Sequence, residues 1–328
     1  MPTTLTITPP DDFDLARDVC SYGYFLLEPN HWDPDSATLA RVLDLEGGAA
    51  GVVIVQQPGG TLRARFDRSL DRREQAEARS QITRMLALDV SASEVAEFHS
   101  VDPRWKKSGR GRLFRSPTLF EDVIKTVTSC NVAWPSTITM NRRLCEVMGR
   151  PCPSGPRAFP TARKLARAKP ETLRARCRVG YRDARMVELA KLFVRGEIDE
   201  SWLADPATDD EAVFKFLKSL PGIGPYAAGN IMQLLGRYSR LAIDTESFRH
   251  ARTVLGMDGS DAELTRALHA HYDPFGRHRF RSYWFELWDY YESRKGPAHT
   301  WDKHTTGTTF TATRLNAAPE RKRPGRSG

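Results

Sequence analysis

One short stretch, residues 220–228 with the sequence LPGIGPYAA, constrains the fold of this chain most strongly. Apolar residues at helical spacing lead into it, and Pro221-Gly222 ends that helix. Gly224 is expected to adopt a backbone conformation that a Cβ would oppose, whereas Ile223 is expected to enter the core. Pro225 suits the first turn of a new helix. The pattern therefore predicts two helices joined by a tight, glycine-rich hairpin.

The predicted hairpin has a chemical consequence. The main-chain N–H groups of Gly222, Gly224 and the start of the second helix are expected to point at one spot, where a phosphate binds without any side-chain charge. An ordinary corner between two helices of an all-α core is the other interpretation of such a turn.

The segment after the hairpin completes a known layout. Residues 236–244 (GRYSRLAID) form a glycine-containing loop that ends in Asp244. Together with the hairpin, this layout resembles the helix-hairpin-helix DNA glycosylase superfamily, in particular its 8-oxoguanine and 3-methyladenine glycosylases, over about residues 13–291. The resemblance implies that the partner is double-stranded DNA containing a damaged base. The candidate DNA contacts within the hairpin are Gly222, Ile223 and Gly224.

The charge of the chain agrees with a polyanionic partner. It has 49 Lys and Arg against 41 Asp and Glu, a formal net charge of +8, although a solvated basic face gives the same balance. The first residues do not have the pattern of a signal peptide, and no apolar run reaches the length of a membrane span. We therefore expect a cytoplasmic, nucleoid-associated monomer with no membrane partner.

Cysteine usage argues against a cofactor. Five scattered cysteines in a cytoplasmic chain do not suggest disulfides. Cys145 and Cys152 have the spacing that opens the iron–sulfur loop of some relatives, but they lie upstream of the hairpin, and the other two cysteines of that loop are missing. We predict no iron–sulfur cluster and no metal site, and a monovalent cation at the hairpin stays open.

The predicted fold class is an α+β N-terminal domain, a small antiparallel sheet with helices, followed by an all-α helix-hairpin-helix domain. Residues 1–95 carry strand patterns at 51–57 and 61–66, a weaker one at 25–27, and an amphipathic helix at 71–88. Residues 96–303 are helical in pattern, and residues 304–328 are expected to form a disordered basic tail. Capping boxes are predicted at Ser91, Thr208 and Ser260. The helices predicted after residue 95 are 119–130, 135–148, 160–167, 170–176, 183–194, 211–220, 226–235, 247–254 and 279–291.

Asp244 is the candidate catalytic carboxylate. Cleavage of an N-glycosidic bond leaves positive charge on the sugar, which a nearby carboxylate stabilises while it orients or deprotonates water. Asp244 also suits the N-cap of the helix predicted at 247–254, and the two roles are compatible. Glu246 is a weaker candidate for contact with the substrate.

Tyr226 and Asn230 are candidate pocket residues. By the resemblance, Tyr226 stands where lyase-competent relatives carry the lysine that forms a Schiff base, which a phenol cannot do. This implies hydrolysis that leaves an abasic site, and a displaced lysine, Lys215 or Lys218, is the alternative. Asn230 stands where an oxoguanine-specific enzyme has a cysteine against the base. The lesion therefore stays open between an alkylated and an oxidised purine.

Two further segments are candidate DNA contacts. By the same resemblance, Tyr181 is the wedge that fills the gap left by a flipped base, and Arg182 contacts the unpaired base. Asn131, at a predicted helix end, helps to recognise that base, because an amide both donates and accepts. The structural alternatives are core packing for the tyrosine, solvation for the arginine and a helix C-cap for the asparagine.

The leading functional hypothesis is a monofunctional DNA N-glycosylase of base-excision repair that acts on a damaged purine. One alternative is a non-catalytic helix-hairpin-helix DNA-binding protein, and Asp244 at the matching position argues against it. The other alternative is a bifunctional glycosylase and abasic-site lyase, and Tyr226 argues against that.

Overall fold

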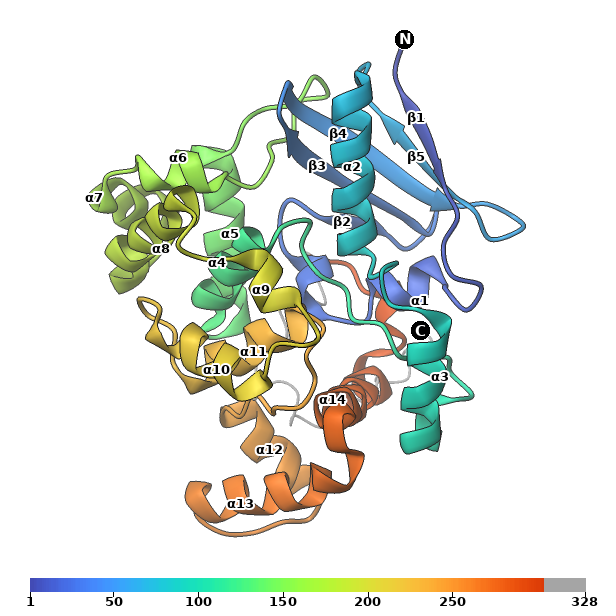
Figure 1. Cartoon of the computed structure of the whole chain (residues 1–328), viewed down its shortest axis with the longest axis vertical. Coiled ribbons are helices and arrows are strands. Elements are labelled where there is room, and N and C mark those ends of the chain that lie inside the picture. The colour runs from blue at the N-terminus through green and yellow to red at the C-terminus, as the bar shows by residue number, and fades with distance from the viewer. Residues whose placement is uncertain (304–328) are drawn as a thin grey trace, which may run out of the picture.

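The computed structural model describes residues 1–303, which form one antiparallel sheet and a larger set of helices (Figure 1). The tail predicted at 304–328 lies outside the described residues. The sheet has five strands in the order β1-β5-β4-β3-β2, and each neighbouring pair is antiparallel. Its strands are β1 Thr4–Ile7, β2 His31–Asp33, β3 Thr38–Leu45, β4 Gly48–Gln56 and β5 Leu62–Phe66.

The first part of the chain agrees with the sequence patterns except at one segment. The two strong strand patterns correspond to β4 and β5, and helix α2 (Arg72–Met85) lies across one face of the sheet (Figure 1). Asp71 and Glu74 cap α2 reciprocally, since the side chain of each accepts from the backbone N–H of the other. The strand predicted at 25–27 is wrong, because this apolar stretch forms a 3₁₀ helix, η1 (Gly23–Leu26). Every residue of η1 is buried, so the stretch has no polar face from which its periodicity could be read.

From residue 92 to the end of the described chain the regular structure is helical, and a short helix, α1 (Leu15–Val19), also precedes the strand β2. The α-helices besides α1 and α2 are α3 Ala92–Val101, α4 Leu119–Ser129, α5 Trp134–Met148, α6 Ala162–Ala166, α7 Pro170–Thr172, α8 Asp183–Arg195, α9 Glu200–Ala204, α10 Asp210–Ser219, α11 Pro225–Leu234, α12 Thr245–Thr253, α13 Asp261–Tyr272 and α14 Arg279–Lys295. None of the described helices is long and apolar enough to cross a membrane.

Some helix ends differ from the prediction. The helix predicted at 170–176 is a single turn, α7, that continues as a π-helix, η3 (Leu173–Cys177). The capping box at Ser260 is present in full. The one predicted at Thr208 is wrong, because the Asp209 carboxylate caps α10 instead. At Ser91 only half of the box forms, since Glu94 pairs with Arg281 on α14.

The described residues form two large hydrophobic cores. The first contains the sheet, α2, η1 and the late helices α12 to α14, and the second is formed by α4 to α11. Residues from the two ends of the described chain therefore share one core. Helix α11 contributes to both, because Ala227 and Ile231 belong to the second core and Leu234 to the first. The hairpin and its second helix thus lie where the two cores meet.

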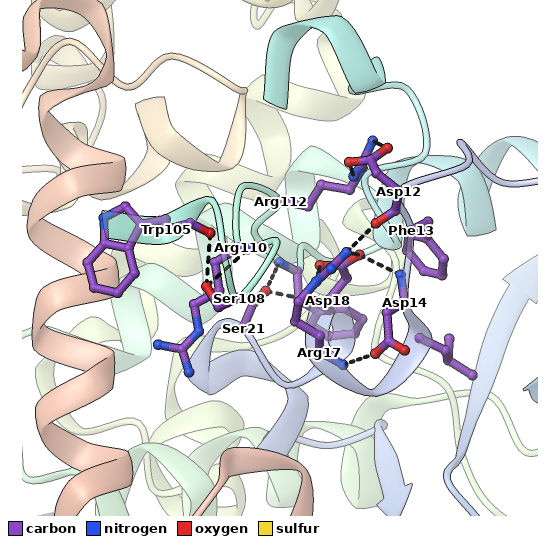
Figure 2. A network of polar contacts seen from close by, with 12 residues as sticks. Asp12, Phe13, Asp14, Arg17, Asp18, Ser21, Trp105, Ser108, Arg110 and Arg112 are labelled. Carbon is purple, nitrogen blue, oxygen red and sulfur yellow. Dashed lines mark hydrogen bonds and ion pairs between the residues drawn. The ribbon is translucent and has the colours of Figure 1, made fainter. Parts of the chain in front are cut away.

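A polar network holds the segment before η1 in place. Figure 2 shows residues 12–21 against the loop that carries Ser108, Arg110 and Arg112. Arg112 Nη2 donates to Asp12 Oδ1 at 2.9 Å. The carbonyls of Cys20 and Ser21 then accept from two tryptophans of α14, Trp288 Nε1 at 3.0 Å and Trp284 Nε1 at 2.8 Å. These contacts fix the position from which the next residue, Tyr22, reaches the junction of the cores.

Candidate active site

A cavity of about 1020 Å³ lies at the junction of the two cores. Its walls come from η1, residues 129–134, the hairpin, residues 242–248 and one face of α14. The aromatic rings of the lining, including Tyr22, Trp134 and Trp284, belong to the first core or pack against it, whereas the second core contributes small apolar residues such as Ala227. Among the described residues that line it, the only charged side chains are those of Asp244 and Glu246. The cavity is therefore aromatic, with charge of one sign only.

The hairpin is built as predicted, but its constrained glycine is a different one. Helix α10 ends at Ser219 and α11 begins at Pro225, with Ile223 buried beneath the turn. Gly222 has a φ of +77°, and a Cβ there would lie 2.8 Å from Arg185 Cδ. Gly224 has a φ of −91°, and a Cβ there would meet open space. The prediction that backbone twist requires Gly224 is thus wrong, and the requirement falls on Gly222.

The turn leaves main-chain donors available. The N–H groups of Gly222 and Gly224 make no hydrogen bond to any residue that the structure describes, whereas Ile223 N bonds to Leu220 O at 3.1 Å. Both glycines are exposed and line the mouth of the cavity. An anion can approach these two N–H groups without displacing any protein contact.

Asp244 lies at the N-terminus of α12, on the wall of the cavity. Its Oδ1 accepts from the main-chain N–H of Glu246 at 2.9 Å and of Ser247 at 3.0 Å. Its Oδ2 accepts no hydrogen bond within the described chain. Burial raises the pKa of the Asp244 carboxyl and the charge of Glu246 adds to this, while the amide hydrogen bonds oppose it. The N-cap role is confirmed, and it holds one carboxylate oxygen while the other stays available.

Glu246 differs from Asp244 in that its charge is already paired. Its Oε1 accepts from Arg249 Nε at 2.6 Å and from the Tyr291 hydroxyl at 2.6 Å. Arg249 is itself buried. Glu246 thus lines the cavity but is held by partners on α12 and α14.

Tyr226 lies in the first turn of α11 and lines the cavity together with Asp244. Burial raises the pKa of its hydroxyl well above the usual value, and the charge of Asp244 adds to this effect. No lysine is among the described residues that line the cavity. Of the two lysines considered as substitutes, Lys215 lies near Glu211 on the surface of α10, and Lys218 lies over the ring of Phe214.

Asn230 is buried at the floor of the cavity with its amide fully engaged. Its Oδ1 accepts from the Tyr22 hydroxyl at 2.7 Å, and its Nδ2 donates to Thr126 Oγ1 at 3.1 Å. Tyr24 joins the same network through a 2.8 Å contact with Thr126 Oγ1. The sequence singled out Asn230 but not Tyr22 or Tyr24, which lie just before the stretch interpreted as a strand at 25–27.

The three candidate DNA contacts outside the hairpin lie together, beside the end of α4. Asn131 has a left-handed φ of +54°, and its Nδ2 lies 3.4 Å from the Tyr181 hydroxyl. Tyr181 is 55% exposed, with the guanidinium groups of Arg182 and Arg185 near its ring. Arg182 is only 5% exposed, because its guanidinium donates to the carbonyls of Val127, Val179 and Cys130. In this structure Arg182 therefore holds the loop together and does not point outward to a base.

Comparison with known proteins identifies the fold of this chain through solved structures. No protein-family model matches the chain, and no curated protein sequence matches it significantly. Solved structures do match. That of MBOgg1 in complex with a low-affinity DNA ligand superposes with a TM-score of 0.67 at 19% identity, covering 90% of this chain and 97% of that one. This chain has the fold of the helix-hairpin-helix DNA glycosylases.

Two further structures share that helix-hairpin-helix glycosylase fold. The 3-methyladenine DNA glycosylase from Archaeoglobus fulgidus gives a TM-score of 0.64 at 19% identity, covering 89% of this chain and 99% of that one. The apo form of the 8-oxoguanine glycosylase/lyase from Clostridium acetobutylicum gives a TM-score of 0.64 at 19% identity, covering 88% and 98%. The α+β segment with its helical continuation is thus confirmed, and the fold spans almost the full length of each neighbour.

Proposed function

We propose that this protein is a monofunctional DNA glycosylase, which takes a modified purine out of duplex DNA and hydrolyses its N-glycosidic bond. The observation that carries the proposal is the position of Asp244. Its carboxylate lies on the wall of a cavity large enough for a flipped nucleotide. It is next to a hairpin whose N–H groups at Gly222 and Gly224 are unpaired among the described residues, and it keeps one oxygen available. The names of two structural neighbours, a 3-methyladenine DNA glycosylase and an 8-oxoguanine glycosylase/lyase, support glycosylase activity.

The chemistry follows from this placement. Loss of the base leaves an oxocarbenium-like sugar, and a carboxylate in a dehydrated site stabilises that charge far better than one in water. Asp244 Oδ2 faces the sugar in this proposal and orients or deprotonates the attacking water. The Gly222 and Gly224 N–H groups hold a phosphate of the same strand. The exposed ring of Tyr181 fills the gap left by the flipped base.

Hydrolysis without strand cleavage is supported by the absence of an amine. A lyase reaction needs a primary amine that condenses with the sugar to a Schiff base. Among the described residues, the lining offers the Tyr226 hydroxyl and the Cys130 thiol near Asp244 but no lysine. Burial raises the pKa of Cys130 to about 11, so it stays a neutral thiol.

The lining also supports a substrate class. Aromatic faces and carboxylates attract a cationic ring, and no described cationic side chain lines the cavity to oppose it. An N-alkylated purine carries such a positive charge, which also weakens its glycosidic bond. We therefore place alkylated purines ahead of oxidised ones. The Asn230 amide is occupied, since Oδ1 accepts from Tyr22 and the two Nδ2 protons go to Thr126 and, at 3.4 Å, to Tyr24, so it has no free group for a carbonyl of an oxidised base.

Release of bases from globally methylated and from oxidised duplex DNA, followed by mass spectrometry, tests the proposal. The expected result is release of an alkylated purine by the wild-type protein and none by Asp244→Asn, with duplex binding retained in the variant. Equal release by both proteins would overturn the role of Asp244. Binding without release from any alkylated, oxidised, deaminated or mispaired duplex would favour a non-catalytic DNA-binding protein.

A further inference from the structure

We propose that Ser247 and Tyr283 are positioning residues for Asp244, acting as a two-step hydrogen-bond chain that starts on α14 and ends on the carboxylate. The inference rests on the proposed function of Asp244 and adds two residues to that site. Neither residue stood out in the sequence, because Ser247 lies inside a predicted helix and Tyr283 inside an aromatic-rich one.

The geometry of the chain is short and buried. The Tyr283 hydroxyl lies 2.8 Å from Ser247 Oγ, and Ser247 Oγ lies 3.3 Å from Asp244 Oδ1. The main-chain N–H of Asp244 donates to Ser247 Oγ at 3.1 Å. Ser247 is fully buried and Tyr283 is 3% exposed, so water does not replace these partners.

Proton counting gives the chain a direction. Ser247 Oγ has one proton and accepts the proton of Asp244 N, and a carboxylate oxygen can only accept. Two acceptors lie within reach of the Ser247 proton, Asp244 Oδ1 at 3.3 Å and, further away, the Ala242 carbonyl at 3.5 Å. When Ser247 donates to either of them, the Tyr283 hydroxyl donates to Ser247, and the nearer acceptor is Asp244. Burial first, and then the charge of Asp244, raises the pKa of Tyr283 well above its usual value, so this hydroxyl keeps its proton at neutral pH. The chain therefore runs from Tyr283 to Ser247 to Asp244.

This direction matters for the charge of Asp244. Burial favours the neutral acid, whereas every hydrogen bond donated to Oδ1 favours the carboxylate. The Ser247 hydroxyl adds a third donor to the two main-chain N–H groups, and Tyr283 fixes the rotamer of that hydroxyl. Because all these donors lie on Oδ1, Oδ2 is left without a hydrogen bond to the described residues.

Other titratable groups also act on Asp244, from each of the elements packed around it. They are Glu246 on α12, Tyr226 on α11, Tyr283 on α14, Tyr22 before η1 and Cys130 after α4. The charge of Glu246 is paired with that of Arg249, and the remaining four groups are uncharged at neutral pH because burial raises their pKa values. Asp244 is thus the group whose ionisation the chain controls.

The experiment uses Tyr283→Phe and Ser247→Ala in the full-length protein. Removing a donor that favours the carboxylate raises the pKa of Asp244, by roughly half a unit to one unit for a neutral hydrogen bond. The acid limb of the pH–rate profile for base release moves to higher pH by that amount, and further for Ser247→Ala, which removes the direct donor. If the substitution only disturbs the structure, the rate falls at all pH values and the acid limb of the profile stays at the same pH.

Tyr272→Phe is the matched control. Tyr272 lies in the same aromatic cluster, 5.5 Å from the Tyr283 ring, and its buried hydroxyl donates to Glu286 and has no link to Asp244. Titration of the Asp244 carboxyl carbon by NMR, in the protein without DNA, reads the same shift independently of activity. If Asp244→Asn still releases bases, the proposed function fails while this titration still tests the chain. An unchanged carboxyl titration in Tyr283→Phe, or an equal shift in Tyr272→Phe, would overturn the inference.

Discussion

The hydroxyl of Tyr22 donates a 2.7 Å hydrogen bond to Oδ1 of Asn230, across 208 positions in the chain. Both groups are buried, so removal of the Tyr22 hydroxyl leaves Asn230 Oδ1 without a hydrogen bond at the cavity floor, and removal of the amide takes away the acceptor of Tyr22. We expect Tyr22→Phe and Asn230→Ala each to lower the free energy of unfolding by about 1–3 kcal/mol. Urea denaturation measures this, and the double variant should lose clearly less than the sum of the two single losses.

A suitable control for this pair is Tyr290→Phe. Tyr290 is half-buried on α14, and its hydroxyl has no hydrogen bond to the described residues. Its loss should change the free energy of unfolding by no more than about 0.5 kcal/mol. Strict additivity in the Tyr22 and Asn230 cycle would contradict the bond as the source of the effect.

This pair also shows what the sequence could and could not predict. Local patterns are enough to predict the hairpin, the N-cap role of Asp244 and the series of helices. These patterns are the helical spacing of apolar residues, the glycines and prolines that end helices, and the residues that cap them. The floor of the cavity does not follow from local patterns, because Tyr22 reaches Asn230 only once the first and last parts of the described chain have formed one core. Likewise, Arg182 looked like a surface arginine, since sequence does not show that three main-chain carbonyls lie around it.

Asp244 is predicted to lower the stability of the fold through the charge that its proposed function requires. Its pKa is raised in the folded state above the usual 3.8, so the folded protein binds the proton more tightly than the unfolded chain. Ionisation therefore lowers stability as the pH rises above about 4. Asparagine caps a helix equally well without a charge, so Asp244→Asn should melt at or above the wild-type temperature at pH 7 and lose this advantage at pH 3.

Asp199, the N-cap of α9, provides a control of opposite sign. Its pKa is lowered, chiefly by the hydroxyl of Ser201 and then by the N–H of Trp202. The ionised form of Asp199 thus stabilises the fold above the unfolded value of 3.8, and this contribution is lost as the pH falls below it. Asp199→Asn should therefore be less stable than wild type at pH 7. If Asp244→Asn and Asp199→Asn change the stability at pH 7 in the same direction, burial is not the cause of the effect at Asp244.

Gly222 is predicted to matter for the stability of the fold, and Gly224 for the binding of DNA. An alanine at position 222 is strained at a φ of +77° and meets the side chain of Arg185, so Gly222→Ala should lower the free energy of unfolding by roughly 1–3 kcal/mol. Gly224→Ala meets open space at an allowed φ and should change it by less than about 0.5 kcal/mol. The added methyl group stands in the open space beside the unpaired N–H of residue 224, where the proposed phosphate binds. Fluorescence anisotropy with duplex DNA should therefore show weakened binding in Gly224→Ala despite an intact fold.

Substitutions at the neighbouring residues Tyr181 and Arg182 are likewise predicted to differ, with one affecting DNA binding and the other affecting stability. Tyr181 is exposed, so Tyr181→Ala should leave the free energy of unfolding within about 0.5 kcal/mol of wild type while weakening the binding of a duplex with an abasic site. Arg182→Ala removes the donor for the carbonyls of Val127, Val179 and Cys130, at an expected loss of about 1–3 kcal/mol. A stable Arg182→Ala protein that has lost only DNA affinity would restore Arg182 as a direct DNA contact.

Tyr226→Lys is predicted to supply the amine that the described lining of the wild-type cavity lacks. Position 226 lines the cavity together with Asp244, so an amine there meets the sugar that Asp244 stabilises in the proposed reaction. Burial lowers the pKa of a lysine amine and so favours the neutral nucleophile, although the nearby carboxylate opposes this. Incubation with an abasic duplex and borohydride should trap a covalent complex with Tyr226→Lys and none with the wild type or Tyr226→Phe. A covalent complex that forms with the wild type and disappears in Lys218→Ala would instead identify Lys218 as a displaced lyase lysine. Failure of Tyr226→Lys to form a complex would show that position 226 does not reach the sugar.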